Sequence, residues 1–403
     1  MIDAVKYDVV IVGGGIVGLA TAHQLINRNP RLTIAIVEKE QRVGEHQSSR
    51  NSGVIHSGIY YEPGSQKAIN CLAGYKALLS FATEHNVPFD LCGKVIVARK
   101  EEELPVLKTL YKRGQENGLE GITWLDGECV IEKEPHVHAV AGIWVPQSGI
   151  IDYGMVCKTL QVLLGSQGVH FKMGHPVTAI KRQPTHVEII TTSETLCTKV
   201  MVNCAGLYAD KVTEMTGMRG NFRILPFRGE FYKLRSEMSH LVNHLVYPVP
   251  DLRFPFLGIH FTQRLDGGIE AGPNAVLGFR REGYRLKDVH IGELIETLTF
   301  TGFWRMAARY WKKGMDEMYR SFSSDAFHRE LIKLLPDLER SDIERSRSGV
   351  RAQCVAADGR MIYDYVILED DQVINVCNAP SPAATSCFSI GQFLAAKAIA
   401  RMT

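Results

Sequence analysis

The sequence predicts an α/β protein, α+β overall, in which a Rossmann-like domain is joined to a second domain built on a mixed sheet. Residues 7–40 run in the order strand, glycine-rich turn, helix, strand, which is typical of a parallel βαβ unit. Apolar runs of strand length recur along the rest of the chain, several of them alternating with polar residues. A chain of 403 residues is also too long for one small core and suits two interleaved domains.

The first strand, turn and helix of this unit contain a G-x-G-x-x-G pattern. The apolar run Val9–Val12 predicts a buried strand, and a helix is expected over 16–27. Gly13 permits the tight turn, Gly15 lets the backbone approach a pyrophosphate, and Gly18 allows the helix to pack closely on the strand. The helix N-terminus then offers free N–H groups and a partial positive charge to phosphates.

The second strand indicates which ligand the unit holds. It covers 32–37 and ends in Glu38, where a carboxylate is placed to accept hydrogen bonds from an adenosine ribose. A glycine-rich turn without a ligand would not explain Glu38. The chain shows no second complete fingerprint of this kind, so a nicotinamide cofactor has no evident site of its own. The pattern therefore favours a tightly held flavin, FAD, which the substrate itself reduces.

Charge and cysteine pattern exclude several classes of partner. The formal net charge of +2 gives no indication of a nucleic-acid-binding surface. Nine cysteines are scattered without a C-x-x-C pair or metal-ligand spacing, so we expect no metal site and a reducing compartment. The chain enters a strand almost at once, without a signal peptide, and no run approaches the ~20 apolar residues that span a bilayer. We therefore expect a cytoplasmic protein.

Three further segments are candidates for cofactor contacts. The polar stretch 48–61 is rich in small donors, segment 199–210 contains a strand that ends in small residues, and 374–386 contains a strand followed by a proline-bracketed loop. A C-terminal helix is expected from Ala384 to Arg401. The predicted cofactor-binding residues are Gly13, Gly15, Ile16, Val17, Gly18, Glu38, Lys39, Ser49, Asn51, Ser52, Gly53, Val54, Val177, Ala205, Gly206, Pro382, Ala383, Ala384 and Thr385.

Together these segments resemble the glutathione-reductase-type FAD fold, in the branch of D-amino-acid oxidase and glycerol-3-phosphate dehydrogenase. Within that branch the chain closely resembles the L-2-hydroxyglutarate dehydrogenase family over nearly its full length. The strings that carry the resemblance are NSGVIHSGIYY (51–61), PFRGE (226–230), FPFLGIHFT (254–262), GPNAVL (272–277), GVRAQ (349–353) and NAPSPAATS (378–386). One departure is visible, because Ser49-Arg50 stand where relatives are expected to have Gly-His.

The resemblance implies FAD-dependent oxidation of L-2-hydroxyglutarate to 2-oxoglutarate, with hydride transfer to flavin N5. We expect a discontinuous FAD domain made of residues 1–90, 150–215 and 345–403. The intervening residues, 91–149 and 216–344, are expected to form the substrate domain. Short alternating runs at 229–234, 245–249 and 257–262 suggest a mixed or antiparallel sheet that roofs the flavin.

Such a reaction requires a group that takes the proton of the C2 hydroxyl. Histidine suits this task because its unperturbed pKa is about 6.5. His56 comes just after the predicted cofactor-binding residues Asn51 to Val54. Its Ile-His-x-Gly string is similar to one beside the flavin of the glycerol-3-phosphate enzymes. His260 lies on a predicted roof strand. We favour His56 as the base and keep His260 as the alternative.

A 2-hydroxydicarboxylate also needs cationic anchors, and arginine supplies bidentate geometry. Arg351 belongs to the Gly-Val-Arg string, which the resemblance places at the substrate site. Arg228 stands in an apolar setting, and its alternative role is a structural salt bridge with Glu230. The remaining candidates are Arg253 and Lys94 as cations, and Tyr60, Tyr61 and Tyr247 as hydroxyl donors.

Residues 292–320 form an amphipathic segment in which aromatic and basic side chains interleave. One interpretation is a helix that lies on an anionic membrane, with Arg305, Arg309, Lys312 and Lys313 towards the lipid. The other is a helix packed on the substrate domain, which would bury its tryptophans.

Two other functions fit the same fold, namely an amine oxidase of the sarcosine or glycine type and an FAD-bearing binding protein without catalysis. The electron acceptor stays open among a quinone, a carrier flavoprotein and dioxygen. A quinone acceptor on a membrane would explain why no nicotinamide site is evident.

Overall fold

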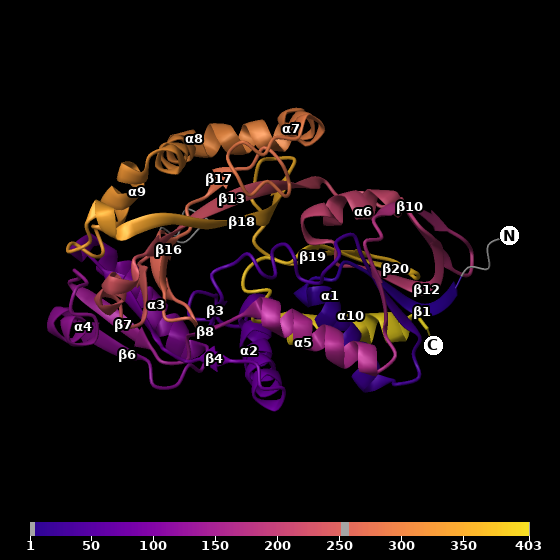
Figure 1. The fold of residues 1–403 in the computed structure, drawn as a ribbon, viewed down its shortest axis with the longest axis horizontal. Helices are drawn as coiled ribbons and strands as arrows, with labels where there is room; N and C mark the ends of the chain where they lie inside the picture. The colour runs from indigo at the N-terminus through magenta and orange to yellow at the C-terminus, as the bar shows by residue number, and fades with distance from the viewer. Residues whose placement is uncertain (1–4, 251–257, 403) are drawn as a thin grey trace.

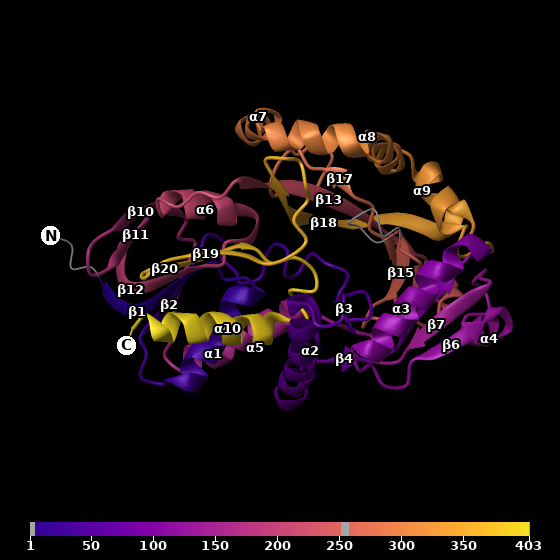
Figure 2. The same ribbon diagram turned by 180° about the vertical axis from the view of Figure 1, so that it is seen from behind.

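The computed structural model describes residues 5–250 and 258–402, and in these the chain forms two halves, each organised around a large sheet (Figure 1). One half contains an eight-stranded sheet and the other a nine-stranded sheet. The predicted α/β class, with a second domain on a mixed sheet, is confirmed. Figure 2 shows the same arrangement from behind.

The eight-stranded sheet has a parallel centre. Its strands are β1 (Val5–Val12), β2 (Ile34–Glu38), β9 (His170–Met173), β10 (Val177–Arg182), β11 (Val187–Thr191), β12 (Thr195–Asn203), β19 (Val366–Glu369) and β20 (Val373–Asn378). β1 lies between β2 and β12, and β9 and β20 extend this parallel core on either side. The expected hairpin near Val177 is present as β10 and β11, which pair antiparallel.

Both faces of this sheet are buried, because successive residues of a strand point to opposite sides. Val9 and Ile11 of β1 belong to the core that also contains the helices α1 (Ile16–Arg28), α2 (Gln66–Glu84), α5 (Tyr153–Ser166) and α10 (Cys387–Ala400). Val10 and Val12 face the other core, which includes α6 (Ala209–Met215) and the β10–β11 hairpin. The continuous apolar run in the sequence reflects this double burial.

The nine-stranded sheet is mixed. Its strands are β5 (Lys94–Ala98), β6 (Thr123–Asp126), β7 (Ala141–Val145), β13 (Phe222–Leu234), β14 (Leu245–Pro248), β15 (His260–Gln263), β16 (Ile269–Gly272), β17 (Val276–Leu277) and β18 (Ile343–Ala356). Most neighbours pair antiparallel, whereas β14 runs parallel to β5. Helix α3 (Leu104–Glu116) packs on one face and α9 (Ser324–Leu331) on the other, and α4 (Gly127–Lys133) follows β6.

Two helices cover the outside of the second half, α7 (Ile291–Leu298) and α8 (Thr301–Phe322) (Figure 1). Met306 of α8 packs inward with Leu225 of β13 and Val355 of β18. Trp304 and Trp311 point away from this core and are 57% and 59% exposed. The expectation that a packed helix buries these tryptophans is therefore wrong.

Two features connect the halves. The long strands β13 and β18 pair along most of their length and extend from the nine-stranded sheet towards the first half (Figure 1). The second is a small sheet of β3 (Val54–Ile55), β8 (Gly149–Ile151) and β4 (Phe89–Asp90), in which β8 pairs with both other strands. β3 belongs to the polar stretch 48–61. Short 3-10 helices complete the fold at Glu101–Glu103, Gly206–Tyr208, Ser236–Leu241 and Arg340–Asp342. Among the described residues, no helix is both long and apolar enough to cross a membrane.

Candidate active site

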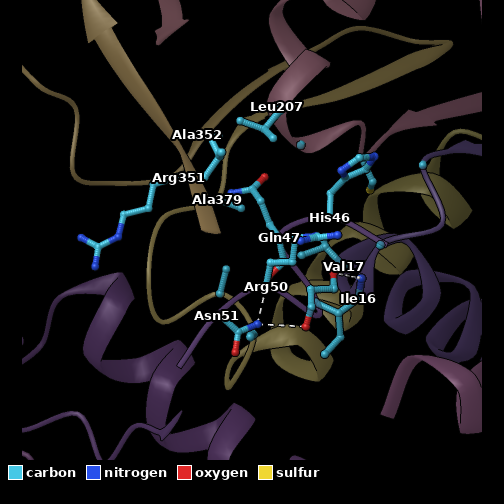
Figure 3. Close-up of a pocket in the computed structure, with 18 of the residues that line it drawn as sticks. Ile16, Val17, His46, Gln47, Arg50, Asn51, Leu207, Arg351, Ala352 and Ala379 are labelled. Atoms are coloured by element: carbon cyan, nitrogen blue, oxygen red, sulfur yellow. Dashed lines mark hydrogen bonds between the residues drawn. The ribbon is translucent and has the colours of Figure 1, made fainter. Parts of the chain in front are cut away.

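A cavity of about 680 Å³ lies between the two halves and is lined by segments from both (Figure 3). Its size falls within the range of about 300–1,000 Å³ that is usual for cofactor and ligand sites. One end contains the glycine-rich turn after β1 and the N-terminus of α1. The other end contains side chains of β14, β15 and β18 together with His56. A ligand that fills the cavity therefore touches both halves.

The cofactor end is formed by backbone rather than by bulky side chains. Gly13 has φ +110, a conformation that favours glycine, and a Cβ there would lie 2.4 Å from the carbonyl oxygen of Cys204. A Cβ on Gly18 would lie 2.2 Å from the carbonyl oxygen of Gly13, so Gly18 permits helix α1 to approach the turn. Helix α1 has no acidic residue in its first turn, and its positive end faces the cavity at Ile16. This arrangement suits the pyrophosphate of a dinucleotide.

Glu38 lies at the end of β2 and lines the same end of the cavity. One carboxylate oxygen accepts the N–H of Gly14 at 2.7 Å, and the other accepts the N–H of Glu40 at 2.9 Å. These two bonds fix the carboxylate, and each oxygen retains a lone pair for a ribose hydroxyl. The residues present therefore fit the adenosine part of FAD.

The structure brings most of the predicted cofactor-binding residues together. Those that line the cavity are Gly13, Gly15, Ile16, Val17, Glu38, Lys39, Asn51, Ser52, Val54, Val177, Ala205, Gly206, Pro382, Ala383 and Ala384. Four others lie behind its wall: Gly18, Ser49, Gly53 and Thr385. Ser49 donates its hydroxyl to the carbonyl of Gly44 at 2.6 Å, and Gly53 adopts φ +71 in a turn. Thr385 accepts the backbone N–H of His56 at 3.2 Å, so it supports the catalytic end instead.

The reactive end contains His56, His260, Tyr247 and Arg351. The rings of Tyr247 and His260 are stacked, with centroids 3.9 Å apart and an interplanar angle of 18°. Nδ1 of His260 lies 2.8 Å from the carbonyl oxygen of Gly258, which can only accept, so Nδ1 carries the proton and Nε2 is the acceptor nitrogen. His260 thus has the tautomer that a general base needs.

Both histidines are held in the neutral form. Burial lowers the pKa of His56 to about 3, and the positive charges of Lys94 and Arg351 act in the same direction. Burial also lowers the pKa of His260 to about 3, against a smaller opposing effect of the hydrogen bond to Gly258. At neutral pH each imidazole is therefore unprotonated, and the nearby cations favour an anionic ligand.

Arg228 does not line this cavity, and its assignment as a substrate anchor is corrected. Alternation along β13 turns Gly229 and Phe231 towards the cavity and Arg228 towards α8. The guanidinium is buried, forms an ion pair with Glu230 at 3.2 Å and donates to the hydroxyl of Ser321 at 3.1 Å. The alternative role as a structural salt bridge describes this geometry.

Of the other predicted substrate contacts, some line the cavity and some do not. Tyr247 and Arg351 line the cavity, whereas Tyr60 and Tyr61 do not, because both tyrosines lie behind its wall. The hydroxyl of Tyr60 is buried and has no hydrogen-bond partner in the described part of the chain. Arg253 lies outside the described residues, as does the start of the string 254–262.

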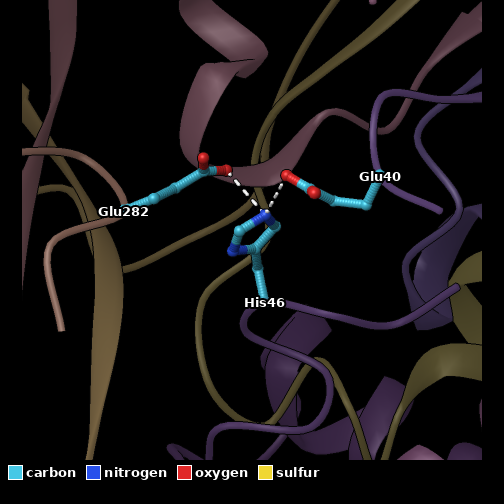
Figure 4. Close-up of side chains that lie close together, drawn as sticks. All are labelled: Glu40, His46 and Glu282. Carbon is cyan, nitrogen blue, oxygen red and sulfur yellow. Dashed lines mark hydrogen bonds and ion pairs between the residues drawn. The ribbon is translucent and has the colours of Figure 1, made fainter. Parts of the chain in front are cut away.

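Residues 279–290, which we call the strap, cross from β17 to α7, and Glu282 of this segment lines the cavity. Glu282 of the strap forms an ion pair with Nε2 of His46 at 3.0 Å (Figure 4). It forms a second ion pair with Lys39 at 2.8 Å. The hydroxyl of Tyr284 lies 2.6 Å from Nδ1 of His46, and the guanidinium of Arg50 lies 3.9 Å from the centre of the Tyr284 ring. The strap is thus fastened to the loop that follows Glu38.

The cluster of Glu40, His46 and Glu282 has the ligand types of a metal site. However, the ammonium of Lys39 pairs with both carboxylates, so the protein itself offsets one of their two negative charges. Burial lowers the pKa of His46, but the hydrogen bonds to Glu282 and Glu40 and the charge of Glu282 together outweigh burial, and the net pKa is raised. The contribution of this ion pair to stability is therefore present below the unfolded pKa of histidine, about 6.5, and is lost as pH rises through the folded pKa.

Sequence reasoning missed several cavity-lining side chains, among them His46, Gln47 and Arg50 (Figure 3). It also missed Glu282. His46 and Arg50 lie in the polar loop before Asn51, where only the departure at Ser49-Arg50 indicated anything unusual. No local signal points to Glu282, because its partners are more than 200 positions earlier in the chain.

Comparison with known proteins places these features in a family context. The family model of FAD-dependent oxidoreductases matches residues 8–397. An L-2-hydroxyglutarate dehydrogenase of Indibacter alkaliphilus is 48% identical over 386 residues, which cover 96% of this chain and 97% of that protein. The L-2-hydroxyglutarate dehydrogenase of Escherichia coli K12 is 40% identical over 392 residues, covering 97% and 93% of the two chains.

Solved structures show the same fold. L-α-glycerophosphate oxidase from Mycoplasma pneumoniae with FAD bound superimposes with a TM-score of 0.78 at 25% identity, covering 98% of this chain and 94% of that one. Glycine oxidase from Geobacillus kaustophilus gives a TM-score of 0.75 at 20% identity, with coverage of 98% and 95%.

Proposed function

The chain belongs to the family of FAD-dependent oxidoreductases, and within it to the L-2-hydroxyglutarate dehydrogenases, and we propose that it oxidises L-2-hydroxyglutarate to 2-oxoglutarate. The observation that carries this proposal is the continuity of one cavity from the glycine turn to two neutral histidines and an arginine. Such a cavity accommodates a dinucleotide at one end and an anionic hydroxy acid at the other.

The residues of the reactive end divide the work of the reaction. Arg351 holds the carboxylate next to C2, because a guanidinium fork matches the two carboxylate oxygens. Nε2 of His260 or the imidazole of His56 takes the proton of the C2 hydroxyl as the C2–H bond breaks and the C–O bond becomes a carbonyl. When FAD is bound, it supplies the acceptor for the hydride that leaves C2. The stack of Tyr247 on His260 fixes the plane of one base throughout.

The decisive experiment is anaerobic reduction of the purified, FAD-loaded enzyme by a panel of compounds. L-2-hydroxyglutarate is expected to bleach the flavin and to yield stoichiometric 2-oxoglutarate, whereas D-2-hydroxyglutarate is not. Sarcosine and glycine test the amine-oxidase alternative. If either amine reduced the flavin faster than the L-hydroxy acid, the proposed substrate class would be wrong.

We further propose that α7 and α8 dock the enzyme on an anionic membrane and that a quinone receives the electrons. Trp304, Trp311 and Met315 follow one another at helical spacing and are all exposed, so they form one apolar stripe along α8. The adjacent exposed Arg305, Arg309 and Lys312 suit anionic headgroups, to which each basic side chain contributes about 1 kcal/mol. A peripheral contact of this kind requires no spanning helix.

Flotation with liposomes at low salt tests the docking surface. Wild-type enzyme is expected to float with vesicles that contain phosphatidylserine, and the double variant Trp304→Ser/Trp311→Ser is expected to stay in the dense fraction. Trp124→Ser is the matched control, since Trp124 is a partly exposed tryptophan of β6. Equal flotation of all three proteins, or rapid peroxide formation with dioxygen as the acceptor, would contradict the proposal.

A further inference from the structure

Lys94 is a buried lysine whose charge has no acidic partner in the described part of the chain. It begins β5 and is only 1% exposed. Burying an unpaired ammonium is costly, so a lysine in such a place is usually tied to a specific electrostatic task. Its surroundings contain aromatic rings instead of carboxylates, with the ammonium 4.0 Å from the centre of the Tyr247 ring and 5.4 Å from that of Tyr60.

The strand order explains how Lys94 reaches the reactive end. β14 lies between β15 and β5 in the nine-stranded sheet. In register Tyr247 is opposite Ile96 of β5, and Lys94 stands two residues earlier on the same face of β5, opposite Leu245, from where its long side chain reaches the Tyr247 ring. The imidazole of His260 lies 3.9 Å and the ammonium of Lys94 4.0 Å from the centre of the same ring. Because the two side chains come from the strands on either side of β14, we infer that they occupy opposite faces of the ring. The result is a three-layer stack of ammonium, phenol ring and imidazole.

This stack has two physical consequences. The cation–π attraction of Lys94 holds the Tyr247 ring in place, and the ring in turn holds the imidazole plane of His260. The positive charge also acts across a medium of low dielectric, so it disfavours a second positive charge on either histidine. The groups that act on Lys94 and on the two histidines are Cys71, Cys92, Tyr60, Tyr247, Gly258 and Arg351, and His260 also acts on His56.

We propose that Lys94 is a positioning residue of the reductive half-reaction, which fixes the Tyr247 ring and through it the imidazole of His260, and whose charge adds to the burial that keeps His260 and His56 unprotonated. The proposal rests on the proposed function for its reaction, and on the stack for its geometry. Burial lowers the pKa of Lys94 itself to about 7, so its charge is complete in acidic solution and declines above neutrality. Its influence on the histidines is therefore greatest at low pH.

The test is the pH dependence of anaerobic flavin reduction by L-2-hydroxyglutarate in wild type, Lys94→Met and Lys94→Arg. Methionine has a similar length, carries no charge and is suited to a buried site, so the variant is expected to fold. Without the cation, the acid limb of the rate profile is expected to move upward by about one pH unit. The ratio of wild-type to variant rates then grows as pH falls, and Lys94→Arg restores the wild-type limb.

A matched control is Lys133→Met, because Lys133 also lies over an aromatic ring, 4.2 Å from the centre of Trp144, but away from the cavity. This variant is expected to keep the wild-type profile. A loss in Lys94→Met that is the same at every pH, or an unmoved acid limb, would show that Lys94 only packs and would overturn the proposal.

A second readout does not depend on the substrate. NMR titration of histidine Cε1 resonances in the substrate-free holoenzyme reports the protonation of His56 and His260 directly. Their titration is expected to move to higher pH in Lys94→Met and to remain at the wild-type position in Lys94→Arg. If L-2-hydroxyglutarate failed to reduce the flavin but these shifts were seen, the proposed function would be wrong and the electrostatic role of Lys94 would stand.

Discussion

Arg228→Met is expected to destabilise the fold far more than it impairs the handling of substrate. Arg228 is 4% exposed, and its loss leaves the buried carboxylate of Glu230 without its cation, retaining the Ser321 hydroxyl at 2.7 Å. Removing one partner of a buried ion pair costs about 3–5 kcal/mol in the free energy of unfolding. The double variant Arg228→Met/Glu230→Gln removes both charges and is expected to recover most of that loss.

The assay is urea unfolding of the holoenzyme, followed by tryptophan and flavin fluorescence, together with kcat/KM for L-2-hydroxyglutarate. The single variant should unfold at clearly lower urea concentration while kcat/KM at permissive temperature remains close to wild type. A stability change below about 0.5 kcal/mol, which is usual for a surface site, combined with a large fall in kcat/KM would refute the reasoning and return Arg228 to the substrate site.

Three further outcomes follow from the cavity. Replacing the general base, tested separately as His56→Asn and His260→Asn, should slow flavin reduction in stopped-flow measurements by about 10²–10⁴-fold with FAD content unchanged, and near-normal rates in both variants would contradict the assignment. Arg351→Lys keeps the charge but loses the fork, so kcat/KM should fall by at least about tenfold while FAD binding is retained; an unchanged value would exclude a bidentate contact. Release of FAD, measured by its fluorescence, should accelerate as pH rises through the raised pKa of His46. Glu282→Gln should abolish this pH dependence. A pH-independent rate in the wild type would contradict a role of the strap in retaining FAD.

The sequence predicted those parts of the fold that local pattern determines. The βαβ unit was readable because a turn with close backbone contacts requires glycine at Gly13 and Gly18, and because both faces of β1 are buried. The C-terminal helix was expected from Ala384 but begins at Cys387, since the backbone after Pro382 first makes turns. Boundaries of this kind depend on capping and loop geometry rather than on hydrophobic periodicity.

The candidate site was less readable, because it depends on which way a strand presents its side chains. His260 and Tyr247 face one another only through the pairing of β14 with β15, and Arg228 is turned away from the cavity by the alternation of β13. The strap could not be foreseen from local sequence either, since Tyr284 and His46 are 238 positions apart. Motif reasoning finds a backbone-built site well and a site assembled from distant side chains poorly.

The two ends of the cavity therefore depend on the fold to different degrees. The cofactor end is made of glycine turns, a helix N-terminus and one carboxylate, and its geometry follows from the fold itself. The reactive end is made of side chains on β14, β15 and β18, which can change without disturbing that turn. A glycerophosphate oxidase and a glycine oxidase share this fold with TM-scores of 0.78 and 0.75, although their names give different substrates. Because the fold is common to all three proteins, we expect specificity to depend on side chains of the reactive end such as Tyr247, His260 and Arg351.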